Sequence, residues 1–416
     1  MASPLVGGDP YKNPELFRFV GSMEGVPDWV DAAETAAELS ARTNWQARAH
    51  HWFLLGGTLL PGLALAGGLA ALGTLLAEWV GSALFGLEKT PVSPILCAIA
   101  LGLAIRNTIG LPAIYELGTQ LCLKRVLRLG VALLGIRLGL AELGAIGLAA
   151  VPIVMATIAT ALLLVVSVSR ALGLPPRLGI LVAVGTAICG NTAIVATGPV
   201  IGASEDEVSY AVGCITVFGL LALIGYPFVA HGIFAGDAGA TGLFLGTAIH
   251  DTAQVVGAGL LYAQQFGSSE VLDVATVTKL VRNLFMLGVI PLAGMLFRRE
   301  ADARGPRPRL RQLVPGFVFG FAALAVVRSI GDAGDAPFGG LLSEDAWRAL
   351  TERLTTLSTA CLAVAMAAVG LGTSLERMRK LGLRPLVVGL VAALAVGGVS
   401  AILIRLFGDL LLGARV

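Results

Sequence analysis

Two apolar stretches of the chain open with the same four residues and then carry polar groups. They are GTAICGNTAIVATG, residues 185–198, and GTAIHDTAQVVGAG, residues 246–259. In a hydrocarbon environment, irregular backbone persists only where it is buried or lines a cavity. Polar groups in such segments are costly and commonly functional. The two stretches are therefore the first candidates for a functional site.

The first stretch combines glycines, which let a helix break, with side chains that can complete a binding shell. A break exposes backbone N–H groups at the start of the second half-helix, where partial positive charge favours anions. Close helix packing through Gly and Thr is the alternative explanation, but an asparagine amide needs several partners. We expect substrate contacts from Thr186, Cys189, Gly190, Asn191 and Thr192.

The second stretch places the adjacent ionisable residues His250 and Asp251 about ten residues into an apolar segment. Histidine titrates near neutral pH, and the neighbouring carboxylate could share or pass a proton, so we expect this pair to couple transport to an ion. Gln254 follows His250 by four residues, which would place both on one helix face, and we expect Gln254 to contact substrate. A structural hydrogen-bond cluster between helices is the alternative.

A third motif, KLVRN, places Lys279 and Arg282 three residues apart, followed by Asn283. If this face points inward, the cations would attract an anion, and arginine would bind its oxygens bidentately. The alternative is that the long side chains extend to the membrane interface. We expect Arg282 and Asn283 to bind substrate, with Lys279 and the more distant Arg137 attracting it.

The composition is that of a polytopic membrane protein. Of the 416 residues, 56% are hydrophobic and 13% are charged, whereas soluble domains are about 25% charged. Several apolar runs are long enough to cross a hydrocarbon core of about 30 Å as helices. The sequence has no motif for ATP binding, metal-dependent proteolysis or serine hydrolysis. We therefore expect no enzyme activity, no cofactor, no metal site and no nucleic-acid partner.

About eleven apolar segments are predicted to cross the membrane. They are residues 54–86, 93–109, 122–140, 145–169, 178–202, 207–230, 240–263, 275–297, 312–330, 350–372 and 383–408. Basic residues cluster after even-numbered segments, whereas SEDE, residues 204–207, and the loop after the ninth segment are acidic. Because positive charge collects in cytoplasmic loops, we expect a multi-pass protein of the inner (plasma) membrane with its N-terminus inside and its C-terminus outside.

Residues 1–52 are predicted to form a polar cytoplasmic extension ahead of a membrane domain that covers residues 53–410. The extension has no apolar core of a signal peptide; it is either an amphipathic helix on the membrane surface or a solvated segment. Within the membrane domain, LGVALLGIRLGL, residues 129–140, resembles LAVAMAAVGLGTSL, residues 362–375. Inverted repeats of secondary transporters show this pattern, although two glycine-rich segments can also agree by chance.

Together, GTAICGNTAIVATGPVI, VFGLLALIGYPFVAHGIF, GTAIHDTAQVVGAG, KLVRN and LRLGVALLGIRLGL resemble the sulfate exporter family of YeiH-like proteins, over roughly residues 53–410. The resemblance implies an all-α fold related to the sodium/proton antiporters and bile acid symporters. Such folds have two inverted repeats of five helices and two broken helices that cross near the membrane centre; here one N-terminal helix would be extra. The break in residues 178–202 would pair with residues 369–374, which adds Gly372 and Thr373 to the substrate site.

We expect a secondary active transporter of a small anion, a sulfur oxyanion such as sulfate or sulfite, that works by alternating access. Coupling would use H⁺ on His250 and Asp251, or Na⁺ on Asn191, Asp251 and backbone carbonyls. The family often has a small residue in place of Asn191 and a glutamate in place of Asp251, which bears on the substrate. The alternatives are a passive anion channel, a transporter of an organic anion, and a membrane sensor that binds a partner through its N-terminal extension. Folds of this kind often form homodimers, but the sequence leaves the oligomeric state open.

Overall fold

The computed structural model describes residues 45–80, 93–297, 316–333, 336–376 and 383–412. Every regular element within these residues is a helix, so the expected all-α class is confirmed for this part of the chain. Most of the predicted N-terminal extension lies outside the described residues. Its boundary at residue 52 and its conformation stay predictions.

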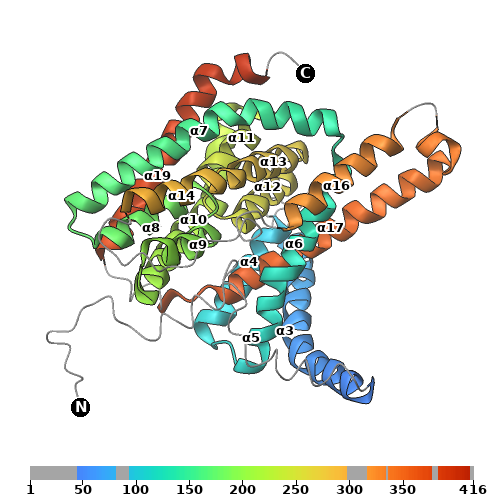
Figure 1. The fold of residues 1–416 in the computed structure, drawn as a ribbon. Coiled ribbons are helices and arrows are strands. Elements are labelled where there is room, and N and C mark those ends of the chain that lie inside the picture. Colours follow the sequence, from blue (N-terminus) through green and yellow to red (C-terminus); the bar gives the residue numbers. More distant parts are fainter. Residues whose placement is uncertain (1–44, 81–92, 298–315, 334–335, 377–382, 413–416) are drawn as a thin grey trace.

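The helices pack as two bundles, one at the upper left of Figure 1 and one along its right and lower sides. The scaffold bundle comprises α3 (Trp45–Trp79), α4 (Pro94–Thr108), α5 (Ala113–Leu121), η4 (Cys122–Val126), α6 (Leu127–Leu134), η5 (Gly135–Arg137), α16 (Gly316–Gly331), η7 (Pro337–Gly340) and α17 (Glu344–Gly372). The hairpin bundle comprises α7 (Leu140–Ala171), α8 (Pro176–Ala187), α9 (Asn191–Ile201), α10 (Glu205–Phe234), α11 (Ala238–Ala248), α12 (Thr252–Phe266), α13 (Glu270–Leu284), α14 (Met286–Phe297) and α19 (Leu383–Leu412). The principal packing between the bundles joins α12 to α4 and α17, and α7 to α16.

Within the described residues, six stretches of helix are long and apolar enough to cross a membrane. They are Gly57–Trp79, Leu140–Ala171, Glu205–Phe234, Glu270–Met295, Glu344–Gly372 and Arg384–Gly408. Other apolar helices, including α8, α9 and α11, are much shorter. At about 1.5 Å per residue, the 12 residues of α8 reach only about halfway across a ~30 Å hydrocarbon core. The arrangement fits a multi-pass membrane protein in which some segments end at mid-depth.

The segment predicted to cross as residues 178–202 is a helical hairpin instead, formed by α8 and α9. The packed helices α7 and α13 begin at the same end, because Arg137, just before α7, forms an ion pair with Asp273 in the first turn of α13. A short loop joins the far end of α7 to α8. The second arm, α9, ends beside the end of α14, where Val200 lies against Gly294. Both open ends of this hairpin therefore lie at the end where α14 finishes.

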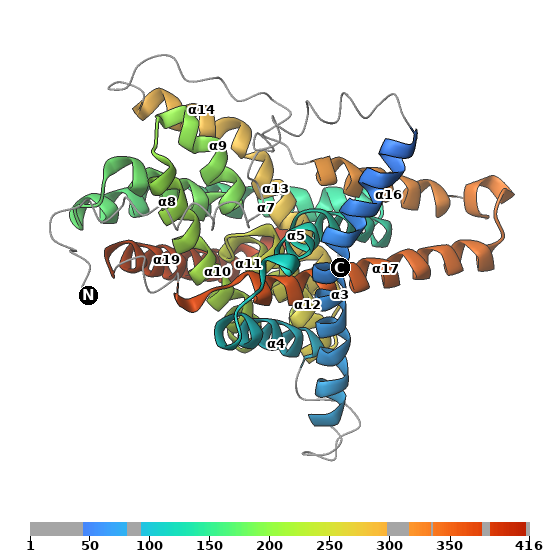
Figure 2. The same cartoon turned by 90° about the horizontal axis from the view of Figure 1, so that it is seen from below.

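The segment predicted to cross as residues 240–263 is also a hairpin, formed by α11 and α12, and it faces the other way. The end of α11 approaches the middle of α13, where Gly246 lies against Thr278. The second arm, α12, then returns along α13 toward its start, where Gly259 lies against Leu272. These contacts show that the two hairpins enter the bundle from opposite ends. In Figure 2, α8 and α9 lie on the opposite side of the molecule from the projecting α16 and α17.

The acidic stretch of residues 204–207, which was used to predict the topology, begins helix α10. Ser204 and Glu207 form a capping box at the start of α10, in which Ser204 N donates to Glu207 Oε2 at 2.8 Å and Glu207 N donates to Ser204 Oγ at 3.2 Å. Carboxylates in a first helical turn also suit the helix dipole. The start of α10 therefore explains the acids of residues 204–207 without reference to the side of the membrane.

The two echoing stretches, residues 129–140 and 362–375, meet at their beginnings in the scaffold bundle, and Gly372 of the second lies against Leu123, which precedes the first. Ser358 Oγ donates to Gly130 O at 2.7 Å, and Gly130 lies against Leu362. Five-helix inverted repeats remain a prediction. The structure does show a shorter inverted pair, which is formed by the two hairpins. The first arm of each hairpin ends within a GTAI sequence, and the two hairpins enter from opposite ends.

Candidate functional site

The tips of the two hairpins meet in the interior of the hairpin bundle. The predicted break after Thr186 is present: α8 ends at Ala187, and α9 begins at Asn191 after Gly190, whose φ of +66° suits glycine. A side chain at Gly190 would meet Asp251 of the other tip. Asn191 Nδ2 donates to Asp251 Oδ2 at 3.2 Å. The partner of the first break is therefore the break at residues 249–251.

Asp251 has a structural task as well as its charge. It is the N-cap of α12, and its Oδ1 accepts from Ala253 N at 2.9 Å. Asp is among the preferred N-cap residues because its side chain satisfies a backbone N–H that the helix leaves unpaired. His250 lies just before this cap, outside the helix. The expectation that His250 and Gln254 share one helix face is therefore wrong, because α12 begins only at Thr252.

Lys279 of α13 holds both tips through their backbone carbonyls. Its Nζ donates to Ile188 O at 2.8 Å in the first tip, and to Ile249 O at 3.0 Å and His250 O at 2.5 Å in the second. Ile188 and Ile249 occupy the same place in the two GTAI stretches. Carbonyls at a helix C-terminus lack partners and carry partial negative charge. The buried ammonium group of Lys279 therefore satisfies carbonyls of both tips.

Arg282, one turn further along α13, repeats the pattern. It donates to Ala187 O at 2.7 Å and Thr186 O in the first tip. In the second tip it donates to Thr247 O at 2.6 Å and Ile249 O at 3.1 Å. Both cations are fully buried. Their N–H groups thus bind backbone rather than substrate, which corrects the expectation of a bidentate Arg282–anion contact. Their charge remains available to attract an anion.

Several polar atoms around the tips are buried without a hydrogen-bond partner among the described residues. Because an unpaired buried donor or acceptor costs about 1–3 kcal/mol, these atoms are candidates for contact with a ligand or with water. They are Thr186 Oγ1, Asn191 Oδ1, His250 Nδ1 and Nε2, Gln254 Oε1, Thr278 Oγ1 and Asn283 Oδ1.

The remaining predicted residues near the tips make weaker or lateral contacts. Cys189 Sγ lies 3.1 Å from Met286 Sδ. Gln254 Nε2 donates to Thr216 O of α10 at 3.4 Å, and Asn283 Nδ2 donates to Thr252 Oγ1 at 3.4 Å. Thr192, in the first turn of α9, is half-buried. Sequence reasoning missed Thr247, Thr252 and Met286, although the repeated GTAI already pointed to Thr247 as the counterpart of Thr186.

Gly372 and Thr373 lie elsewhere, in the scaffold bundle. Thr373 O accepts from Asn107 Nδ2 at 3.0 Å, and Gly372 faces Leu123. Residues 369–374 are therefore not the partner of the first break. These residues were expected there because of their position in a five-helix repeat. The tip of the hairpin formed by α11 and α12 lies against the first break instead.

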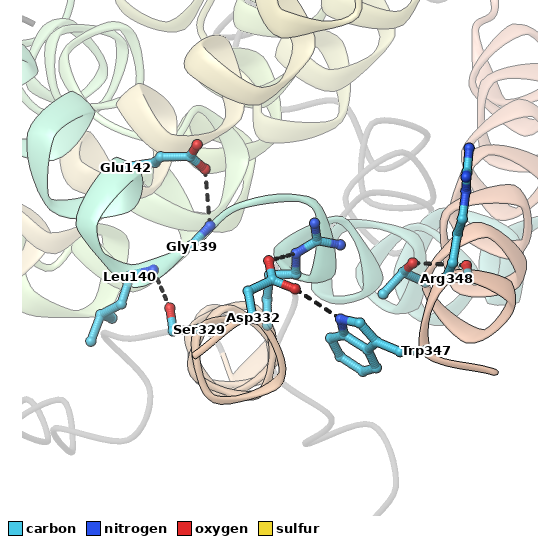
Figure 3. Close-up of polar contacts among 9 residues, drawn as sticks. Gly139, Leu140, Glu142, Ser329, Asp332, Trp347 and Arg348 are labelled. Atoms are coloured by element: carbon cyan, nitrogen blue, oxygen red, sulfur yellow. Dashed lines mark hydrogen bonds and ion pairs between the residues drawn. The ribbon is translucent and has the colours of Figure 1, made fainter. Parts of the chain in front are cut away.

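Arg137 also lies away from the tips, at the boundary between the bundles. Among the polar links that join the bundles there, we call three the clasp: Arg137 Nη2–Asp273 Oδ2 at 2.9 Å, Leu140 N–Ser329 Oγ at 2.6 Å and Ser93 Oγ–Gln264 Oε1 at 2.6 Å. Figure 3 shows the second link beside the Glu142–Gly139 contact that begins α7 and the Trp347–Asp332 contact that joins α17 to α16. All three links lie at the end where α13 begins.

Comparison with known proteins gives a family. The family described as conserved hypothetical protein 698 matches residues 61–389, which include both tips and the cations between them. UPF0324 membrane protein PA5383 of Pseudomonas aeruginosa is 31% identical over 353 residues, covering 82% of this chain and 92% of that protein. UPF0324 membrane protein TauZ of Paracoccus pantotrophus is 33% identical over 327 residues, covering 77% and 88%. A UPF0324 membrane protein of Bacillus cereus is 29% identical over 318 residues, covering 76% and 87%. No solved structure matches the chain.

Proposed function

We propose that this chain, which belongs to the conserved hypothetical protein 698 (UPF0324) family of membrane proteins, is a secondary active transporter of a small anion. One observation carries the proposal: two helical hairpins enter from opposite ends and meet at buried polar tips held by Lys279 and Arg282. Interrupted helices that meet near mid-depth are the usual binding architecture of secondary transporters. Irregular backbone at that depth is tolerated only around such a site.

The charge of the tips favours an anion. Lys279 and Arg282 are both buried with Asp251, so the three side chains together leave one positive charge unbalanced. The partial charges of two helix C-termini and two helix N-termini meet there and offset each other. In a poorly screened interior this excess attracts a negative ligand. The resemblance to sulfate exporters makes sulfate and sulfite the first anions to test.

The two-bundle construction supports alternating access. Contact between the bundles is narrow, and the three clasp links all lie at one end. A movement of the hairpin bundle against the scaffold that breaks the clasp would open that end while the tips stay together. A passive channel would need a path open to both ends, whereas the tip residues His250 and Asp251 are 0% and 4% exposed.

Asp251 is the proposed site of ion coupling, because it is the carboxylate shared by both tips. The coupling ion is H⁺ or Na⁺. We further propose that the protein is not an enzyme and that it lies in the plasma membrane with its N-terminus inside.

The test is flux of labelled sulfate and sulfite in liposomes that contain the purified protein, with an imposed pH or Na⁺ gradient. Uphill accumulation that follows one gradient is the expected result. Asp251→Asn should abolish it, and Asp345→Asn, an exposed carboxylate at the start of α17, should not. Flux that runs only downhill, whatever the gradient, would refute active transport.

A further inference from the structure

We infer that the ammonium group of Lys279 fills, from within, a site for a monovalent cation between the two hairpin tips, and that the coupling ion is therefore H⁺ and not Na⁺. The inference rests on the proposed function, because ion coupling presupposes transport. It goes beyond that function by choosing between the two ions and by assigning to Lys279 the place that Na⁺ would take.

The oxygens around Lys279 Nζ form the kind of site that binds a monovalent cation. They are the carbonyl oxygens of Ile188, Ile249 and His250, at 2.8, 3.0 and 2.5 Å from Nζ. Ile188 and Ile249 are the C-caps of α8 and α11. In transporters built from interrupted helices, half-helix C-termini and unwound carbonyls are the groups that coordinate the coupling ion. Here the same groups surround a side-chain nitrogen.

The acceptors around this nitrogen show that it carries its charge. A protonated lysine has three N–H donors and no acceptor, and three carbonyl oxygens lie within hydrogen-bond distance of Nζ. A neutral amine would turn its lone pair toward one of these oxygens, which is repulsive. Lys279 is also 0% exposed, so bulk water does not compete for the ammonium group. Lys279 is thus a cation that the chain itself supplies to the site.

Arg282 engages the neighbouring carbonyls of both tips. It donates to Thr186 O and Ala187 O in the first tip. In the second tip it donates to Thr247 O and shares Ile249 O with the ammonium group. A Na⁺ ion that used these carbonyls would have to displace a cationic side chain. The displaced group would remain buried without its partners, which is strongly unfavourable.

The carboxyl group at the tips suits a proton. Asp251 Oδ2 accepts from Asn191 Nδ2 at 3.2 Å, and Asn191 Oδ1 is buried without a partner among the described residues. A half-turn of the amide would let Oδ1 accept the hydrogen of a protonated Asp251. The pair can therefore stay hydrogen-bonded in both protonation states. Na⁺ would need further oxygen ligands, and the carbonyls that Lys279 and Arg282 hold are already engaged.

The first test is thermal unfolding of the purified wild-type protein in detergent, in chloride salts of Na⁺, K⁺ and choline at about 200 mM. A cation that binds only the folded protein raises its unfolding temperature. Because the site is already filled, we expect the three unfolding temperatures to agree within about 1 °C. A larger rise that is specific to Na⁺ would overturn the inference.

Lys279→Ala then tests the site by emptying it. The substitution removes the ammonium group and the stem beyond Cβ, and n-propylammonium replaces both. The unfolding temperature of the variant should fall, and n-propylammonium at about 200 mM should restore at least about 3 °C of the loss. Tetramethylammonium, a cation without N–H donors, should restore none of it.

Lys124→Ala is the matched control, because Lys124 is a half-buried lysine of η4 in the scaffold bundle. Its unfolding temperature should respond equally to the two organic cations. An equal response of Lys279→Ala to both would show that Lys279 does not fill a cation site. If Lys279→Ala does not fold in any of the salts, the wild-type protein decides through its response to Na⁺ and through its flux.

Flux in liposomes assigns the coupling ion. Anion accumulation should follow an imposed pH gradient and should be unchanged when choline replaces Na⁺ on both sides. Accumulation driven by a Na⁺ gradient would refute the inference and leave the transporter standing. If no gradient drives accumulation, the transporter and its coupling ion both fail, and the unfolding measurements alone decide whether Lys279 fills the cation site.

Discussion

The two hairpins share a tip sequence and a pair of cations, yet their surroundings differ. The first hairpin, α8 and α9, packs on α7, α10 and α14, all within its own bundle. The second, α11 and α12, places α12 against α4 and α17 of the scaffold and carries one of the clasp links at Gln264. The first hairpin is thus built into one bundle, whereas the second lies at the boundary along which the bundles would move.

The chemistry of the tips is divided in the same way. The first tip carries Cys189, Gly190 and Asn191, none of which is charged at neutral pH when buried, whereas the second carries His250 and Asp251. The ionisable groups therefore sit on the hairpin that contacts the scaffold. Under the proposed transport function, we therefore expect ion coupling to depend on the second tip more than on the first.

The largest effect should follow from removing what both hairpins share. Arg282→Met leaves carbonyls of both tips unpaired in the interior, and we expect a loss of about 3–5 kcal/mol of stability together with transport. Thermal unfolding in detergent measures the loss. Arg328→Met, which removes a half-exposed pair with Asp332, is the control and should cost less than about 0.5 kcal/mol. Wild-type stability of Arg282→Met would mean that the cation does not hold the tips.

The next effect should separate the two tips. Asp251→Asn keeps a good N-cap, so stability should change by less than about 1 kcal/mol while gradient-driven accumulation disappears. Asn191→Ala removes the partner amide of the first tip and should slow transport without ending its dependence on the gradient. Liposome flux with and without the gradient distinguishes them. If Asn191→Ala also abolishes coupling, the tips are equivalent and the comparison fails.

A smaller effect tests the backbone of the first tip alone. Gly190 has a φ of +66°, and a Cβ there would meet Asp251 and Ile215, so Gly190→Ala should cost about 1–3 kcal/mol. Gly144→Ala is the control, because Gly144 lies in α7 with open space around it and alanine is the better helix former. Equal unfolding temperatures for the two variants would show that the turn at Gly190 is not required.

The smallest effect concerns the clasp. Gln264→Leu removes the acceptor for Ser93 Oγ and Ile95 N at the end of α12 and should weaken the boundary by about 1 kcal/mol. Hydrogen exchange should become severalfold faster in α12 and stay unchanged in α8 and α9. Faster exchange in both hairpins would show that they open together.

The sequence singled out most of the polar residues that meet at the hairpin tips but misjudged their geometry. The break between Thr186 and Asn191, the ionisable pair at His250 and Asp251 and the cations at Lys279 and Arg282 were all visible, because polar residues are conspicuous in apolar segments. The sequence did not show that the second arm of each hairpin, α9 or α12, turns back toward the end from which the first arm enters. Residues 204–207 suggested a change of side, although Ser204 and Glu207 also form the capping box that begins α10.

Composition and pattern alone determined the class of this protein, since a chain of this hydrophobicity must satisfy its backbone within helices in a membrane. They also determined where those helices break. Only the tertiary structure decided that the broken segments turn back and meet, because a break exposes the same carbonyls whether the chain continues or reverses. Those carbonyls are satisfied by Lys279 and Arg282 of α13. For the first tip these partners lie about ninety residues away in sequence, and no local pattern can specify them.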